Sequence, residues 1–140
     1  MRKFAFALCF LVGGPAAAQT PAAVVKQVGE IQWKVSGALP PSAEYTLIYE
    51  EPATHAVQLL VRFPSGYALA DHSHSRDETI LVVKGKLIVD IGQGPSTLKP
   101  GSYATIPAGL MHSLKAKGAC MFLMTTNGPY DVKGLPGVKL

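Results

Sequence analysis

The chain has 140 residues, enough for one domain and not comfortably for two. Its apolar content is 48% and its charged content 16%, and its 14 glycines and 11 prolines are spread along the chain, which favours a compact all-β domain with many turns over a disordered chain. The formal net charge is +4, but no cluster of Lys and Arg forms a basic stripe, so the pattern argues against a nucleic-acid partner.

Residues 1–18 have the pattern of a signal peptide. Two cations in the first three residues precede an apolar run over Phe4–Val12, which is too short to span a bilayer as a helix, and small residues follow at Ala16–Ala18. We expect cleavage after Ala18, giving an exported, periplasmic or secreted protein with no membrane partner. A buried first strand and an uncleaved anchor are the alternatives. A lipid anchor on Cys9 is excluded, because a leucine and not a small residue precedes it.

Removal of this leader lowers the apparent basicity of the chain. Eleven cations against nine acids then leave a net charge of +2. The remaining cysteine, Cys120, lies in an apolar run and has no partner for an intramolecular disulfide. We therefore expect a buried, inert thiol and a fold held by core packing alone.

Short extended segments separated by turn residues follow one another along the mature chain. Residues 19–42 are expected to form an arm and a first strand in which Ile31, Trp33 and Val35 share one face, residues 43–127 a β-barrel domain, and residues 128–140 a surface coil. About nine strands without helical periodicity predict a sandwich or barrel. The predicted strands cover residues 31–35, 44–50, 56–63, 67–73, 78–84, 86–91, 102–106, 111–116 and 119–126.

Two of these strands are apolar on both faces. In residues 79–83 and 120–124 hydrophobic side chains do not alternate with polar ones, which is typical of strands covered on both sides. One face can fill the barrel. The other needs a second sheet, the N-terminal strands or another subunit, so the pattern favours a homodimer.

Three of the four histidines fall in two turn-rich stretches. His72 and His74 are two apart on an extended segment and point the same way, and Glu78 begins the next strand across a turn; His112 follows later. Three imidazoles and a carboxylate suit one divalent transition-metal ion, such as Fe, Mn, Co, Ni, Cu or Zn, with open positions for a small molecule. The alternative is a set of solvated polar side chains, which is the interpretation we give to His55.

The same residues carry a family resemblance. Residues 66–85 reproduce G-x5-H-x-H-x3-E-x6-G and residues 101–112 reproduce G-x5-P-x-G-x2-H, which resemble the first and second motifs of the cupins, fifteen residues apart. The resemblance implies a single-domain jelly-roll β-barrel of two antiparallel sheets that holds one metal ion through His72, His74, Glu78 and His112. Ala116 stands where the family usually has Asn, which puts a turn-stabilising hydrogen bond in doubt, but not a ligand.

Several other polar side chains flank these motifs and are candidates for contacts with a substrate or with the ligands. Asp77 is expected to stabilise its turn, and Asp71 either does the same or holds an imidazole N–H. The remaining candidates each have a structural alternative, as a surface cation or as an aromatic or apolar side chain at the edge of the core. The candidates are Arg62, Tyr67, Asp71, Tyr103 and Met111.

The motifs leave the reaction open. Small exported cupins that resemble this chain include proteins described as dioxygenases, which implies a metal-dependent dioxygenase-type oxidoreductase acting on a small organic molecule. No second acid or base stands out in the sequence as a partner for the metal, which favours instead a non-catalytic module that binds or senses a metal or small molecule. A metal-dependent sugar isomerase is a third possibility, although no basic residue for it can be placed.

Overall fold

The computed structural model describes residues 22–37 and 39–135, and the predicted signal peptide lies outside them. This part of the chain contains one 3-10 turn, η1 (Val28–Glu30), and no helix long and apolar enough to cross a bilayer. Ten strands make up the rest of the regular structure. They are β1 (Lys34–Val35), β2 (Glu44–Glu50), β3 (Val57–Phe63), β4 (Ala68–His72), β5 (Glu78–Lys84), β6 (Leu87–Asp90), β7 (Pro95–Leu98), β8 (Tyr103–Ile106), β9 (His112–Ala116) and β10 (Cys120–Thr126).

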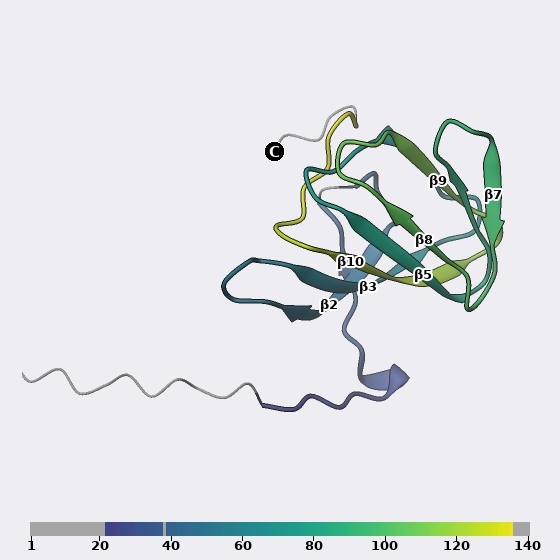
Figure 1. The fold of residues 1–140 in the computed structure, drawn as a ribbon. Coiled ribbons are helices and arrows are strands. Elements are labelled where there is room, and N and C mark those ends of the chain that lie inside the picture. The colour runs from purple at the N-terminus through teal and green to yellow at the C-terminus, as the bar shows by residue number, and fades with distance from the viewer. Residues whose placement is uncertain (1–21, 38, 136–140) are drawn as a thin grey trace, which may run out of the picture.

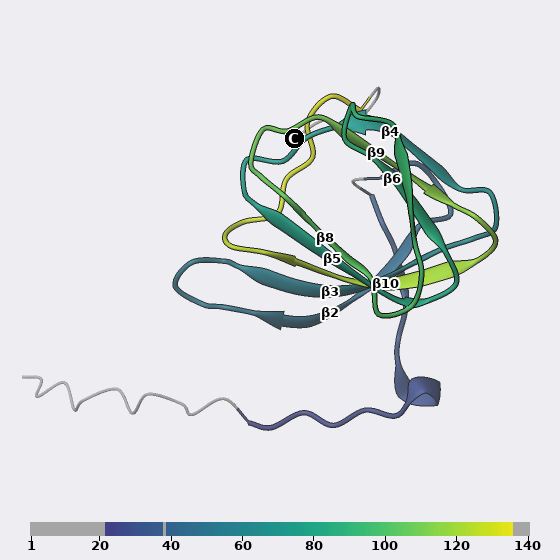
Figure 2. The same ribbon diagram turned by 45° about the vertical axis from the view of Figure 1, so that its right-hand side comes forward.

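The strands form two antiparallel sheets, so the predicted all-β jelly-roll barrel is confirmed. One sheet has six strands in the order β1-β2-β3-β10-β5-β8, and the other has four in the order β4-β9-β6-β7. Neighbours in each sheet are often far apart in sequence, as β3 and β10 are. Figures 1 and 2 show the two sheets facing each other across a common interior, with the N-terminal arm extending away from them.

Alternation along the strands fills the space between the sheets. Leu59, Val61 and Phe63 of β3 point inward, and so do the alternate residues of β5 and β10 that follow the same period of two. Phe63 packs edge-on against Phe122, with 5.0 Å between ring centroids. Cys120 is buried in this core as expected, and burial raises the pKa of its thiol.

One expectation about the strands was wrong. The segment 31–35 forms only the two-residue strand β1, and Val35 is 67% exposed. On β5, Ile80 and Val82 are buried inside the barrel, whereas Leu81 and Val83 are exposed on the outer surface of this chain. The cover expected on that outer face stays a prediction.

The described part of the C-terminal segment, residues 127–135, is coil as expected, but it does not lie wholly on the surface. After β10 it returns along one end of the barrel, as the yellow ribbon in Figures 1 and 2 shows. Ser73 and Lys133 exchange two backbone hydrogen bonds of 3.0 and 2.9 Å, and Val132 is only 2% exposed. The pairing of this irregular segment with the residues between β4 and β5 depends on a long-range contact that local periodicity cannot reveal.

Candidate metal centre

Four polar side chains meet inside the barrel at the end where β4, β5 and β9 come together. His72 is the last residue of β4 and is paired with His112, the first residue of β9. His74 follows in the turn, and Glu78 begins β5. All four residues are buried, at 3% exposure or less, in a region otherwise lined by hydrophobic residues. Burial of this many polar groups is costly unless each finds a partner.

The three imidazoles have one orientation in common. Each Nδ1 lies against a backbone carbonyl, which can only accept a hydrogen bond: His72 donates to Ala70 at 2.8 Å, His112 to Leu110 at 3.0 Å, and His74 to Asp131. In each neutral ring the proton is therefore on Nδ1, and Nε2 keeps a lone pair. One ring nitrogen from each of the three histidines lies within 4.8 Å of the others, so His72, His74 and His112 can hold one metal ion.

Glu78 completes the polar cluster. Its Oε2 lies 3.2 Å from His112 Nε2 and 3.5 Å from His74 Nε2. These three buried atoms have no hydrogen-bond partner with suitable geometry. Unpartnered nitrogen and oxygen atoms that converge in this way fit a divalent cation, which would satisfy all of them at once. The residues present therefore suit the metal that the sequence motifs imply.

The electrostatics of the cluster are uneven. Burial lowers the pKa of His72 to about 4, which keeps this imidazole neutral and able to bind a metal. Burial acts in the same direction on His112, but the nearby Glu78 carboxylate and the Leu110 carbonyl outweigh it and raise the pKa of His112. Of the two imidazoles that face Glu78, His112 lies nearer to its carboxylate, at 3.2 Å against 3.5 Å for His74.

The C-terminal segment also supports the cluster, which no pattern in the sequence indicated. The carbonyl of Asp131 holds His74, and the carboxylate of the same residue accepts hydrogen bonds from the Ser75 backbone N–H at 2.7 Å and from its hydroxyl at 2.6 Å. The ring of Tyr130 stacks on His74 at 5.3 Å between centroids. No motif marks these residues, because their role comes from where the segment docks.

Three predicted helper residues lie away from the metal ligands. Arg62 is on the outer face of β3, where its Nε lies 2.5 Å from a carboxylate oxygen of Glu44 and its guanidinium stacks over Trp33. Tyr67 packs on Phe63 and donates to the Pro40 carbonyl at 2.8 Å, and burial raises its pKa to about 12. Tyr103 is 69% exposed on the outside of β8. We therefore assign these side chains no contact with the ligands.

The remaining candidates lie at the rim. Asp71 is exposed beside His72, and backbone carbonyls occupy the imidazole N–H groups that it was a candidate to hold. Met111 is exposed next to His112 and close to the C-terminal segment. Asp77 does more than stabilise its own turn, because its carboxylate accepts from Ala108 N–H and from the side chain of Asn127, both at 2.9 Å. It joins three loops around the metal centre.

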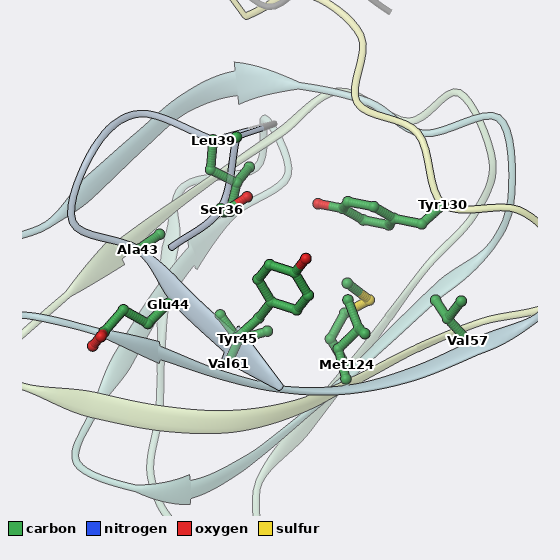
Figure 3. Close-up of a pocket in the computed structure, with 11 residues that line it drawn as sticks. Ser36, Leu39, Ala43, Glu44, Tyr45, Val57, Val61, Met124 and Tyr130 are labelled. Carbon is green, nitrogen blue, oxygen red and sulfur yellow. The ribbon is translucent and has the colours of Figure 1, made fainter. Parts of the chain in front are cut away.

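Two spaces lie at or near the cluster. The inner cavity, of about 20 Å³, lies beside His72 and Glu78 and has room for about one water molecule. The outer hollow, of about 230 Å³, lies between strands β2 and β3, Met124, Tyr130 and four residues before β2, which are Ser36, Gly37, Leu39 and Ala43 (Figure 3). Leu39, Val61, Met124 and Tyr130 line both spaces, so the outer hollow leads toward the metal centre.

The comparisons with known proteins agree with this architecture. Residues 59–126 match the family model of the cupin domain. The chain belongs to the cupin superfamily. The matched region contains all four residues of the cluster, but stops before the C-terminal segment that holds His74. A comparison with curated proteins found no match.

Solved structures of other proteins share the fold at low sequence identity. An acetylacetone dioxygenase from Acinetobacter johnsonii is 22% identical, with a TM-score of 0.69, over 89% of this chain and 87% of that one. KdgF from a Halomonas species is 20% identical, with a TM-score of 0.61, over 72% of this chain and 92% of that one. The Cnp3 cupin domain of Schizosaccharomyces pombe is 16% identical, with a TM-score of 0.62, over 75% and 74% of the two chains. At these identities the likeness shows the fold alone.

Proposed function

We propose that this cupin is an exported metal-dependent enzyme of the dioxygenase type that acts on a small organic molecule. The observation that carries the proposal is the convergence of three buried histidines, whose Nδ1 atoms face backbone carbonyls, with one Glu78 oxygen near a hollow that opens to the outside. The likeness to an acetylacetone dioxygenase supports this reaction class as a hypothesis. Bound by these residues, a divalent iron, manganese, nickel or copper ion would supply Lewis acidity and open positions for dioxygen and substrate.

The protein's own residues would keep that centre in one geometry. The carbonyls of Ala70, Leu110 and Asp131 fix the three imidazole rings and leave each Nε2 free for a ligand bond. The hydrophobic walls around the inner cavity limit water to about one molecule, which strengthens electrostatic interactions at the centre. Glu78, which lies within 3.5 Å of two imidazole nitrogens, is proposed as the fourth ligand.

A specific observation also supports a non-catalytic binding or sensing module. Among the described residues that line the inner cavity, the polar ones are His72, Glu78 and Tyr130, and the first two are proposed ligands. No further carboxylate or imidazole lies there to move a proton. A sugar isomerase fits less well, because the hydrophobic walls offer few partners for sugar hydroxyl groups.

The experiment that tests the proposal uses the chain from Gln19 onward, loaded in turn with Fe, Mn, Ni or Cu. Oxygen consumption is measured with a panel of phenols and diketones, with His72→Ala as the control that should lose the metal. Consumption with at least one metal and substrate, absent in His72→Ala, supports the enzyme. Ligand binding by calorimetry without oxygen consumption by any pair would instead favour the binding module.

Export is tested separately by fractionation and by N-terminal sequencing of the native protein. We expect a periplasmic or secreted protein that begins at Gln19. A protein that keeps Met1 would contradict the assignment of the signal peptide. Metal analysis of the same native material identifies the ion, for which iron would favour oxygen chemistry and zinc would favour hydrolysis, structure or sensing.

We also propose that the outer face of the six-stranded sheet pairs with a second copy of the chain. Leu60, Leu123, Leu81 and Tyr103 are consecutive partners across β3, β10, β5 and β8, and form one hydrophobic row on that face. A row of this kind resembles the covered strand face that the sequence predicted. Sedimentation of the native chain and of Leu81→Lys tests it: a dimer that becomes monomeric supports the proposal, and a monomeric native chain overturns it.

A further inference from the structure

The outer hollow has the character of a binding site. It is bounded on one side by the loop before β2 and on the other by β3, and the rings of Tyr45 and Tyr130 face it from opposite sides, with their hydroxyl groups pointing into it (Figure 3). Its volume is about 230 Å³, against about 20 Å³ for the inner cavity, which has room for about one water molecule. It is therefore large enough for a small organic molecule and too small for a polymer.

The hollow is next to the metal centre rather than separate from it. Tyr130 lines the hollow and also the inner cavity, and its ring stacks on His74. The following residue, Asp131, binds the Nδ1 of the same histidine. A molecule in the hollow would thus lie against the side chain that separates it from a metal ligand, which makes Tyr130 the side chain best placed to select what approaches the metal.

The chemistry of the walls restricts the class of ligand. Most of the lining surface is hydrophobic, and none of the described residues that form it is cationic. Glu44 is its one charged lining residue, and the carboxylate of that residue is paired with Arg62 on the outer face. A carboxylate or phosphate that entered would lose its hydration without gaining a cation, which is a large cost. Two phenolic hydroxyls can each donate one hydrogen bond to a neutral oxygen acceptor.

We propose that the outer hollow binds a small, uncharged, mainly hydrophobic molecule that carries one or two carbonyl-type oxygens, and that Tyr45 and Tyr130 donate hydrogen bonds to these oxygens. This inference rests on the proposed function for the role of the ligand as a substrate, but the binding itself does not depend on the metal. Tyr130 is a specificity-determining residue that lies between the bound molecule and His74.

The test compares two probes of similar size on the metal-free protein. Hexan-2-one is neutral and carries one carbonyl, whereas hexanoate adds a negative charge to a chain of about the same length. We expect hexan-2-one to shift the amide NMR signals of residues 36–45 and 130, and hexanoate to bind at least about tenfold more weakly. Equal or tighter binding of hexanoate, or no binding of hexan-2-one, overturns the proposal.

Variants then locate the bound probe. Val57→Phe adds a ring to the wall of the hollow and should abolish binding, while Val83→Phe makes the same change on the exposed outer face of β5 and should leave it unchanged. Tyr45→Phe and Tyr130→Phe each remove one hydroxyl and should weaken binding about three- to tenfold. These two conservative variants decide the question if Val57→Phe does not fold; unchanged binding in both would refute the assigned donors.

The same variants separate this inference from the proposed function. Binding of the ketone as described, with no oxygen consumption for any metal, would refute the proposed enzyme activity and support the ligand site in the outer hollow. Oxygen consumption by the metal-loaded protein, with a KM that Val57→Phe does not change, would support the enzyme activity and refute the ligand site. Both readouts come from the folded chain, checked by circular dichroism for each variant.

Discussion

We predict that the C-terminal segment orients His74 for metal binding, and replacing Asp131 with Ala tests this. The carboxylate of Asp131 accepts two hydrogen bonds from Ser75, and the carbonyl of the same residue accepts the Nδ1–H of His74. The replacement leaves the carbonyl in the chain but removes the two side-chain hydrogen bonds that tie Asp131 to Ser75. His74 should then sample other ring orientations, and the three Nε2 atoms should no longer be held together before metal binding.

The expected magnitude follows from those contacts. Loss of a group that orients a metal ligand typically lowers metal affinity about 10- to 100-fold, or about 1.4 to 2.7 kcal/mol. Burial of the Asp131 carboxyl acts to raise its pKa, but the hydrogen bonds from Ser75 outweigh that effect, and the pKa lies below its usual range. Because the side chain is 22% exposed, we expect the free energy of unfolding to fall by only about 1 to 3 kcal/mol.

The assay is a competition titration of Zn²⁺ or Co²⁺ against a chelator, for the native chain, Asp131→Ala and Asp131→Asn. The asparagine keeps one acceptor oxygen for Ser75 and should give an intermediate affinity. Asp71→Ala is the matched control, since it removes an exposed carboxylate next to His72 that has no part in this contact. Native affinity in Asp131→Ala, or an equal loss in Asp71→Ala, would show that the segment does not orient His74.

Three further predictions concern the ligands and the frame around them. His72→Ala and His112→Ala should each abolish stoichiometric metal binding, measured by elemental analysis. Circular dichroism should still show a folded barrel, because the hydrophobic strands form the core. An unfolded metal-free chain would mean that the ion is structural. Gly85→Ala should lower the free energy of unfolding in urea by more than about 3 kcal/mol, because φ is +79° and a Cβ would lie 2.3 Å from the Ala119 carbonyl oxygen. Gly94→Ala, at φ +95° in open space, should lower it by only about 1 to 2 kcal/mol. Similar losses for both variants would refute the steric argument. The metal-free chain should lose about 3 kcal/mol of stability as the pH falls from about 6.5 to 4, because His72 has a pKa of about 4 when folded and takes up a proton near 6.5 when unfolded. Denaturation measured at stepped pH should show this loss in the native chain and a smaller loss in His72→Gln.

Local patterns predicted the parts of the structure that depend on near neighbours. Alternation along strands placed His72 and His74 on one side of the chain, and the glycines at turns separated the segments that became strands. The same rule would have settled the direction of Arg62. Its neighbours Val61 and Phe63 are hydrophobic and point inward, so a residue between them must point outward.

Other features could not be predicted because they join residues far apart in sequence. The contact of Asp131 with His74 spans 57 residues, and that of Asp77 with Asn127 spans 50. Neither pair has a characteristic spacing, and residues 127–135 show no period of either a helix or a strand. Their positions follow from the docking of the whole segment against the barrel end.

The sequence by itself determined the all-β class, the two turn-framed motifs and the identity of the polar side chains that can bind a metal. These follow from side-chain alternation, backbone freedom at glycine and the chemistry of imidazole and carboxylate groups, all of which are local properties. The tertiary structure alone decided which ring nitrogen of each histidine is free, that Tyr130 and Asp131 support His74, and that a hydrophobic hollow adjoins the centre. Those features exist only when the two sheets and the returning C-terminal segment pack together, because each is formed by groups that distant parts of the chain supply.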